Sequence, residues 1–568
     1  MPATRPADIA SRAAPPSARA ALRLLQLGAV LVVLAGAPFP YFDLDRHSVP
    51  KELALHLAAF AAALVCLASA AMAKRLALTL LDLLLVAFLA LSVVGAVGAT
   101  NPWLAFRAVG VSLAGALVFW TARAVRGAGL ARPLLAGLAA AAVLGAATGL
   151  VQAYGLHVPG LDDLISQSRA PGGTFGNRNF LAHLMAIAFP AVLWATLRAR
   201  RGWGALLGVA GAALVACALV LTRSRAAWLG FGATGTLLAV ELLLRGRLRS
   251  SATWRRRAQA VALALAAGAA AALALPNTLD WRSDNPYVES LTGVANFREG
   301  SGRGRLIQWR NTMGMVEDHP LLGVGAGNWP VAYGRYTTPR DPAWDTGSLM
   351  PTNPWPSSDW VAYLAERGAP AFVALLLAGG VLVLRGWRAM QRVGQRGGAN
   401  RRGDGAPPLD DAGLDGLVVI ATVVATVVVG AFDAVLLLPL PTFFVWGIVG
   451  ALAPAGRPVV SFGLGGGSRR ALVALTAAAG LAFAVRNASQ FAAMTLYTHG
   501  RRAATLERAA RVDPGSYRIH ILLATTYRNR GRCAQARPHA VAARDLFPNN
   551  PAPRAVLRAC GGGRARRP

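Results

Sequence analysis

Long apolar runs, separated by short polar stretches, recur along most of the chain. Each run holds roughly 18 to 22 residues, which is long enough to cross about 30 Å of hydrocarbon. The pattern predicts thirteen membrane-spanning helices, of which the twelfth is short, at residues 24–40, 53–73, 76–97, 105–122, 133–153, 180–197, 203–221, 226–244, 258–275, 369–385, 416–438, 440–455 and 470–486. We therefore predict an all-α, polytopic integral membrane protein of 12–13 transmembrane helices.

The same pattern divides the chain into five parts. They are a polar leader (1–23), helices one to nine (24–275), a long outer segment (276–368), helices ten to thirteen (369–486) and a helical tail (487–568). Residues 276–368, called the long segment below, form the largest interruption of the membrane pattern and contain a helix-like piece at 303–317. Loops of such length are uncommon and usually functional, so we expect the site there.

Charge adds an orientation to this picture. The chain has a net charge of +32, yet only 15% of its residues are charged, whereas a soluble protein carries about a quarter. Most of the basic residues fall in alternate loops, which the positive-inside rule explains without nucleic acid. The leader, with Arg5, Arg12, Arg19 and Arg23, predicts a cytoplasmic N-terminus. No cleavage signal is evident, and the first apolar run, at 24–40, is expected to be a retained helix.

A few arginines break the orientation pattern. "LTRSRAAWLGF" (221–231) places Arg223 and Arg225 at the outer end of a helix, and "SGRGRLIQWRNTM" (301–313) places Arg305 in the long segment. "GGTFGNRNFLAH" (172–183) adds Arg178 at a helix entrance. Guanidinium groups bind phosphate oxygens through paired hydrogen bonds and stay charged in a site with little water. For Arg225 and Arg305 we favour such a role; Arg223 has snorkelling to lipid headgroups as its alternative, and Arg178 a simple helix-entry turn.

The tail resembles a different kind of protein. "GRCAQARPHAVAARDLFPNN" (531–550) has the spacing of a tetratricopeptide helix, and the Asp513-Pro514 and Phe547-Pro548 boundaries are one 34-residue period apart. Helical repeats form protein-interaction surfaces, so the tail predicts a protein partner. Thirteen helices place it outside and twelve place it inside; we predict outside. There Cys533 and Cys560 either form a disulfide or pack in the repeat.

Four segments occur in an order that resembles the O-antigen ligase and O-antigen polymerase superfamily. They are "GGTFGNRNFLAHL", "LTRSRAAWLG", "GRLIQWRNTMGMVEDHPLLGVGAGNW" and "SSDWVAYLAERGAPAF", and the resemblance covers roughly residues 20–455. It implies an inverting membrane glycosyltransferase without metal or cofactor in the bacterial inner membrane. This enzyme would take a glycan from an undecaprenyl-diphosphate carrier on the periplasmic face. The acceptor would be a lipid A-core sugar, a second carrier-linked glycan or a protein hydroxyl, and Arg225 and Arg305 would hold the diphosphate.

The chain departs from the family at the position of its expected general base. The family pattern has a histidine about nine residues before the Glu of its "E-x-G" step, and here that position is Ser357. Serine is no base near neutral pH. Either Asp359 or His319 takes the role, or positioning and leaving-group stabilisation suffice without a base. The remaining alternative is a catalytically silent carrier-glycan binder or scaffold. A transporter is disfavoured, because the sequence shows neither an intramembrane carboxylate relay nor a clear inverted repeat.

Overall fold

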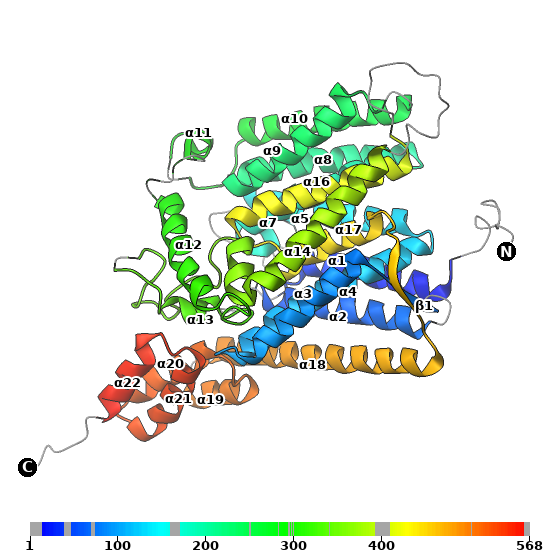
Figure 1. Cartoon of the computed structure of the whole chain (residues 1–568). Coiled ribbons are helices and arrows are strands. Elements are labelled where there is room, and N and C mark those ends of the chain that lie inside the picture. Colours follow the sequence, from blue (N-terminus) through cyan, green and yellow to red (C-terminus); the bar gives the residue numbers. More distant parts are fainter. Residues whose placement is uncertain are drawn as a thin grey trace, which may run out of the picture.

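The protein is a bundle of long helices with a smaller helical tail beside one end (Figure 1). The computed structural model describes residues 14–38, 47–69, 74–158, 171–248, 251–281, 283–293, 296, 298, 300–339, 341–391, 409–500 and 502–561. Arg5 and Arg12 of the leader, and most of the basic loop up to Arg402, lie outside these residues. The predicted all-α membrane class is confirmed.

Within the described residues, twelve helices are long and apolar enough to cross a membrane, and the shorter α17 (Pro439–Leu452) is also apolar. The twelve are α1 (Pro16–Leu34), α2 (Val49–Ala68), α3 (Leu80–Val97), α4 (Pro102–Gly127), α5 (Ala131–Ala153), α7 (Arg178–Leu197), α8 (Gly202–Thr222), α9 (Arg225–Ala239) with its π-helical extension (Val240–Leu244), α10 (Ala252–Ala274), α14 (Asp359–Gln391), α16 (Asp411–Phe432) and α18 (Gly466–His499).

Two helices form the centre of the bundle. α7 is buried over most of its length, and every residue of α17 is buried. α7 packs against α5, α8, α9, α16 and α17, whereas α18 lies at the edge against α2. A helix that is apolar all round suits a buried position, which explains why α17 spans the centre although it has only 14 residues.

A small sheet, absent from the helix prediction, precedes two of the helices. Strand β1 (Arg75–Thr79) pairs antiparallel with β2 (Pro458–Gly463), with Arg75 opposite Gly463. The predicted helix at 76–97 therefore begins only at Leu80. The physical reason is a capping box, in which Thr79 and Asp82 satisfy each other's backbone amides at the start of α3.

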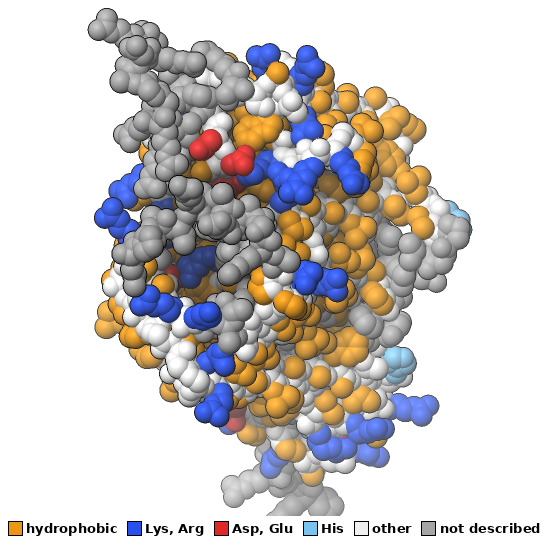
Figure 2. All heavy atoms as spheres, turned by 90° about the vertical axis from the view of Figure 1, so that its right-hand side faces the viewer, with side chains coloured by type: hydrophobic (Ala, Val, Ile, Leu, Met, Phe, Trp, Pro, Cys, Tyr) orange, Lys and Arg blue, Asp and Glu red, His pale blue; other side chains and the backbone are white. Residues whose placement is uncertain are grey.

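The far end of the bundle is strongly basic. Figure 2 views the end of the bundle opposite the tail, and Lys and Arg side chains gather there between apolar surfaces. Some of them meet acids at helix ends: Arg198 pairs with Asp411 of α16, and Arg245 with Glu241 at 2.8 Å. The alternating basic loops of the sequence thus meet at one end of the molecule.

The long segment folds over the other end of the bundle. It contains α11 (Pro286–Thr292), α12 (Gly300–Asp318), which corresponds to the predicted piece at 303–317, and α13 (Trp329–Tyr333). The segment runs into α14 through a kink at Gly368, whose φ of 76° and ψ of 167° are not helical. A side chain there would meet the carbonyl oxygen of Leu321 at 2.1 Å, so only glycine lets the two chains approach. The kink holds the loop after α12 against α14.

The tail consists of α19 (Ala503–Val512), α20 (Tyr517–Asn529), α21 (Cys533–Leu546) and α22 (Pro551–Gly561). It lies at the same end as the long segment, because Asn549 donates a 2.9 Å hydrogen bond to the carbonyl of Val331 in α13. A buried ion pair of 2.9 Å between Arg486 and Asp513 ties it to α18. The side of the membrane on which the tail lies stays a prediction.

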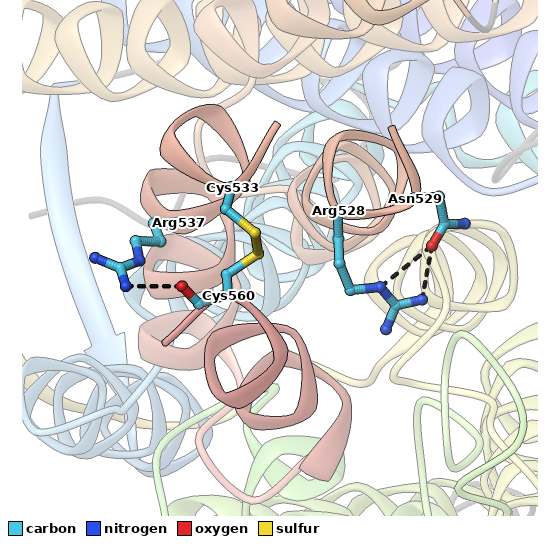
Figure 3. The surroundings of a disulfide bond; sticks show 5 residues. All are labelled: Arg528, Asn529, Cys533, Arg537 and Cys560. Carbon is cyan, nitrogen blue, oxygen red and sulfur yellow. Dashed lines mark hydrogen bonds between the residues drawn. A yellow bond between two sulfur atoms is a disulfide. The ribbon is translucent and has the colours of Figure 1, made fainter. Parts of the chain in front are cut away.

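A disulfide joins Cys533 at the start of α21 to Cys560 near the end of α22 (Figure 3). Beside it, Arg537 of α21 donates a 2.8 Å hydrogen bond to the carbonyl of Cys560. Of the two sequence alternatives for these cysteines, the structure contains the disulfide. Cys66 and Cys217 are buried and free. The assignment of the tail to the tetratricopeptide class stays a prediction.

Candidate functional site

Two of the predicted arginines flank a sharp break between helices. α8 ends at Thr222 and α9 begins at Arg225, and Arg223 between them has a φ of 53°. This left-handed conformation ends α8, and it costs a residue other than glycine about 1–2 kcal/mol. This strained conformation occurs where the side chains of Arg223 and Arg225 both reach the face covered by the long segment.

Contacts with the long segment hold these two arginines in place. Arg223 donates a 2.9 Å hydrogen bond to Ser290 Oγ, lies 3.5 Å from Glu289 and stacks over Trp281 at 4.5 Å. Arg225 donates to the carbonyl of Gly293. The arginines are therefore fixed by α11 and its flanking residues, which explains why α11 folds over the break.

Arg178 enters the same site from α7. It is the first residue of that helix, after Asn177, whose side chain accepts from the amide of Asn179. Its guanidinium lies 5.9 Å from the ring of Trp281, close enough to Arg223 and Arg225 for electrostatic interaction. The Gly/Asn-rich turn thus places a cation beside the helix break.

Arg305 approaches from α12. Its half-buried guanidinium interacts electrostatically with Asp433 and Arg225. Burial lowers the pKa of Arg305, Asp433 raises it and Arg225 lowers it further. The ordinary arginine pKa is so high that the group keeps its charge. Arg303 and Arg310 of the same helix are exposed to solvent.

Four predicted residues therefore meet in one place. We call Arg178, Arg223, Arg225 and Arg305 the arginine cluster; they come from α7, the α8–α9 break and α12. Glu289 and Asp433 offset part of the charge. Like charges held together beneath a protein segment repel each other strongly, and an anion with several oxygens relieves that repulsion. Binding of a polyanionic group by this cluster is a hypothesis that its geometry is consistent with.

Asp433 connects the cluster to a buried histidine that the sequence analysis did not consider. It follows α16, and its side chain is 12% exposed. Asp433 Oδ2 accepts a 3.3 Å hydrogen bond from Asn179 and lies 3.8 Å from His183 Nε2. Asn179 and His183 are four residues apart, so they share one face of α7. The four-residue spacing of Asn179 and His183 within the Gly/Asn-rich motif was the signal in the sequence that could have identified His183.

Asp359 and Ser357 lie where the long segment meets α14. The carboxylate of Asp359 is fully buried and accepts hydrogen bonds of 2.9 and 2.7 Å from the amides of Val435 and Leu436. It therefore ties the start of α14 to the connection between α16 and α17. Ser357 is partly exposed and has a φ of 51°. A role of Asp359 as the general base stays a hypothesis, but both of its carboxylate oxygens already accept hydrogen bonds.

His319 lies away from the arginine cluster. It is exposed just beyond the end of α12, fourteen residues after Arg305, which corresponds to about 21 Å along a helix. Nearby, Glu366 accepts hydrogen bonds from the amides of Gly327 and Trp329, at 2.8 and 3.2 Å. These contacts hold the glycine-rich loop against α14, where Gly325 and Gly327 have positive φ. The structure does not bring His319 together with the other candidates.

The described residues contain no group of three or more His, Cys, Asp or Glu side chains arranged to hold a metal ion. The side chains at the cluster and beside it carry guanidinium, carboxylate and imidazole groups. Together they are able to bind a diphosphate, stabilise a departing oxyanion and accept a proton.

Part of the chain is similar to a known protein family. Residues 210–376 match the family model described as O-Antigen ligase. The matched span runs from α8 to the first half of α14, and it includes three members of the arginine cluster together with Ser357 and Asp359. No curated protein matches the chain. The protein is thus a multi-pass membrane protein whose residues 210–376 are similar to O-antigen ligases.

Proposed function

We propose that the protein transfers or polymerises a glycan carried by undecaprenyl diphosphate on the periplasmic face of the bacterial inner membrane. The observation that carries this proposal is the arginine cluster at one end of the bundle, mostly inside the span similar to O-antigen ligases. A lipid-linked diphosphate has charged oxygens at the membrane surface and an apolar chain in the bilayer. This combination fits four cations at the end of a membrane bundle.

The cluster supplies the main catalytic effect in this proposal. As the bond between the sugar and the diphosphate breaks, negative charge grows on the departing oxygen. Preorganised cations that stabilise such a charge commonly provide the largest part of the rate enhancement. Arg225 and Arg305, which interact across the site, are placed to contact the diphosphate first. Arg223 and Arg178 complete its surroundings through their shared contact with Trp281.

The test is a transfer assay with the full chain in lipid nanodiscs, a labelled undecaprenyl-diphosphate glycan, and lipid A-core, carrier-linked or protein acceptors. We expect release of the carrier by the wild type. Arg305→Ala should weaken carrier binding about 10- to 100-fold, because a hydrogen bond to a charged group contributes about 1.5–3 kcal/mol. Arg310→Ala is the matched control, since Arg310 is an exposed arginine of the same helix. Equal effects of the two substitutions would contradict a specific diphosphate site.

A catalytically silent binder remains the second candidate because of Ser357. A hydroxyl cannot accept the acceptor's proton, and the chain would then hold carrier-linked glycan without transferring it. Ser357→His discriminates the two, and histidine tolerates a positive φ better than most residues. If the protein is a silent binder, the wild type should bind the carrier without turnover, and only Ser357→His should show turnover. An active enzyme should already release carrier with serine in place.

Orientation and partners complete the proposal. The basic end of the bundle would face the cytoplasm, and the long segment and the tail would lie in the periplasm, in contact with membrane lipids at their base. The disulfide of the tail supports this side, because disulfides persist in oxidising compartments. The tail would offer its helices to a protein partner, as helical repeats do.

A further inference from the structure

His183 is a buried histidine without an evident structural task. Its side chain is fully inaccessible, and neither ring nitrogen makes a hydrogen bond of good geometry, although the backbone of Ala434 lies close enough to interact with the ring. Leaving a buried polar group without a partner costs about 1–3 kcal/mol. The nearest charged group is Asp433, whose Oδ2 lies 3.8 Å from His183 Nε2. A group kept at such a cost beside a partly exposed carboxylate suggests a functional role.

The position of His183 relates it to the missing family histidine. The ring of Phe180 lies 6.1 Å from that of His183 and 6.0 Å from that of Trp355. Trp355 is two residues before Ser357. Phe180 therefore lies between the ring of His183 and the loop in which the resemblance expects an imidazole.

The arginine cluster adjoins the same pair. Asp433 and Arg305 interact electrostatically, and Arg305 also interacts with His183. Asp433 thus lies between a cation that would hold the leaving group and a histidine behind it. Its 12% exposed carboxylate reaches the site, whereas His183 does not.

We propose that Asp433 accepts the proton of the acceptor hydroxyl and that His183, as a positioning residue behind it, receives that proton. This inference rests on the proposed function and names the groups that replace the imidazole absent at Ser357. The acceptor oxygen forms a bond to the anomeric carbon, and the bond from that carbon to the diphosphate oxygen breaks. The bonding electron pair leaves with the diphosphate. The acceptor's proton passes to Asp433, then to His183 Nε2, and returns to solvent after the carrier departs.

The alternative is that Asp433 only neutralises Arg305 and that His183 only packs. The two roles differ in what they affect. Loss of a packing or neutralising contact would change carrier binding or stability, whereas loss of a proton acceptor lowers kcat and leaves carrier affinity unchanged. Glutamine at 183 keeps a polar side chain of similar size but takes up no proton.

The experiment compares wild type, His183→Gln, Asp433→Asn and His56→Gln in the nanodisc assay, with carrier Kd, melting temperature and kcat measured for each. His56 is the matched control, since it is another buried histidine with an unpartnered Nε2, on α2. We expect kcat to fall at least tenfold in His183→Gln and more in Asp433→Asn. Carrier Kd in His183→Gln should stay within twofold of wild type, and His56→Gln should keep the wild-type kcat.

The outcomes separate this inference from the proposed function. Carrier release by wild type together with a wild-type kcat in His183→Gln overturns the role of the pair and leaves the transferase intact. A fall of kcat in His183→Gln matched by a similar fall in carrier affinity assigns His183 to packing and also overturns the inference. Absence of release by wild type with every acceptor overturns both proposals.

Discussion

At the scale of single residues, the two acids near the site differ in burial and in the charged groups around them. Asp359 is fully buried, and two backbone amides donate to its carboxylate. Asp433 also accepts two hydrogen bonds, from Asn179 Nδ2 and from the amide of Ala434, but its carboxylate keeps 12% exposure and faces charged groups. Of the two, Asp433 is therefore better placed for chemistry, and Asp359 for holding α14 to the connection between α16 and α17.

This difference predicts the effect of Asp359→Asn. The amide keeps one acceptor oxygen and turns a donor toward one of the two backbone amides, so we expect a loss of roughly 1–3 kcal/mol in stability. The measurement is thermal unfolding in nanodiscs. Asp345→Asn, at an exposed loop carboxylate, should change the melting temperature much less. An unchanged melting temperature with abolished turnover would instead identify Asp359 as the base, as one sequence hypothesis holds.

Most members of the arginine cluster could be singled out from the sequence alone. Arg223, Arg225 and Arg305 lie on the side where the orientation pattern predicts few basic residues. Charged groups at membrane depth are costly and are therefore candidates for a functional site. His183 was missed, because a lone histidine in an apolar helix is indistinguishable from a packing residue until its neighbours are known. The neighbour that matters, Asp433, lies 250 residues away in the chain.

At the scale of elements, the kink at Gly368 determines how the long segment reaches the site. The amide of Ala369 donates to the carbonyl of Pro320, and the backbone of Gly368 passes beside Leu321. This contact fixes the end of α12, whose other end carries Arg305. A substitution at the kink should therefore alter the position of Arg305 within the arginine cluster.

We predict that Gly368→Ala destabilises the protein by at least about 2 kcal/mol, because the residue combines positive φ with a contact of 2.1 Å that a side chain cannot make. Carrier affinity should fall with it. Gly379→Ala is the control in the same helix, where an added methyl group meets nothing within 4 Å. The prediction fails if both variants unfold at the wild-type temperature.

Element positions were predictable to within a few residues where apolar runs were long, as for α5 and α7. The first and last residues of a helix were less predictable where local interactions determine where that helix begins or ends. The start of α3 depends on a capping box and a strand pair with residues 458–463. The start of α14 lies ten residues before the predicted helix, because hydropathy does not register the polar turn anchored by Asp359.

At the scale of the whole molecule, the tail is joined to the membrane bundle by polar contacts at several points. Asn101 of the α3–α4 turn donates a 3.3 Å hydrogen bond to the carbonyl of Leu546, and Asn549 contacts Val331. The tail is thus part of the same face as the long segment. Any partner bound to it would lie beside the site.

The disulfide gives a prediction about both stability and side. A cross-link that closes 27 residues stabilises by about 3.5 kcal/mol in the chain-entropy estimate. Cys533→Ser should therefore make the tail much more sensitive to protease, while a Cys217→Ser control, at a free buried thiol, should leave the tail as resistant as in wild type. In intact cells, Cys533 and Cys560 should resist alkylation until a reductant is added. Alkylation without a reductant would place the tail in a reducing compartment.

The sequence by itself determined the membrane class and a set of 12–13 apolar helices, and it singled out arginines as candidates for an anion site. These follow from local properties, because apolar length dictates spanning and guanidinium chemistry does not depend on context. Tertiary structure alone decided that Arg178, Arg223, Arg225 and Arg305 form one cluster, and that His183 lies behind Asp433. It also placed the tail beside the long segment. Such proximities arise from the packing of α7, α9 and α16 against one another and of α12 against α14, and no local pattern in the chain encodes which helices become neighbours.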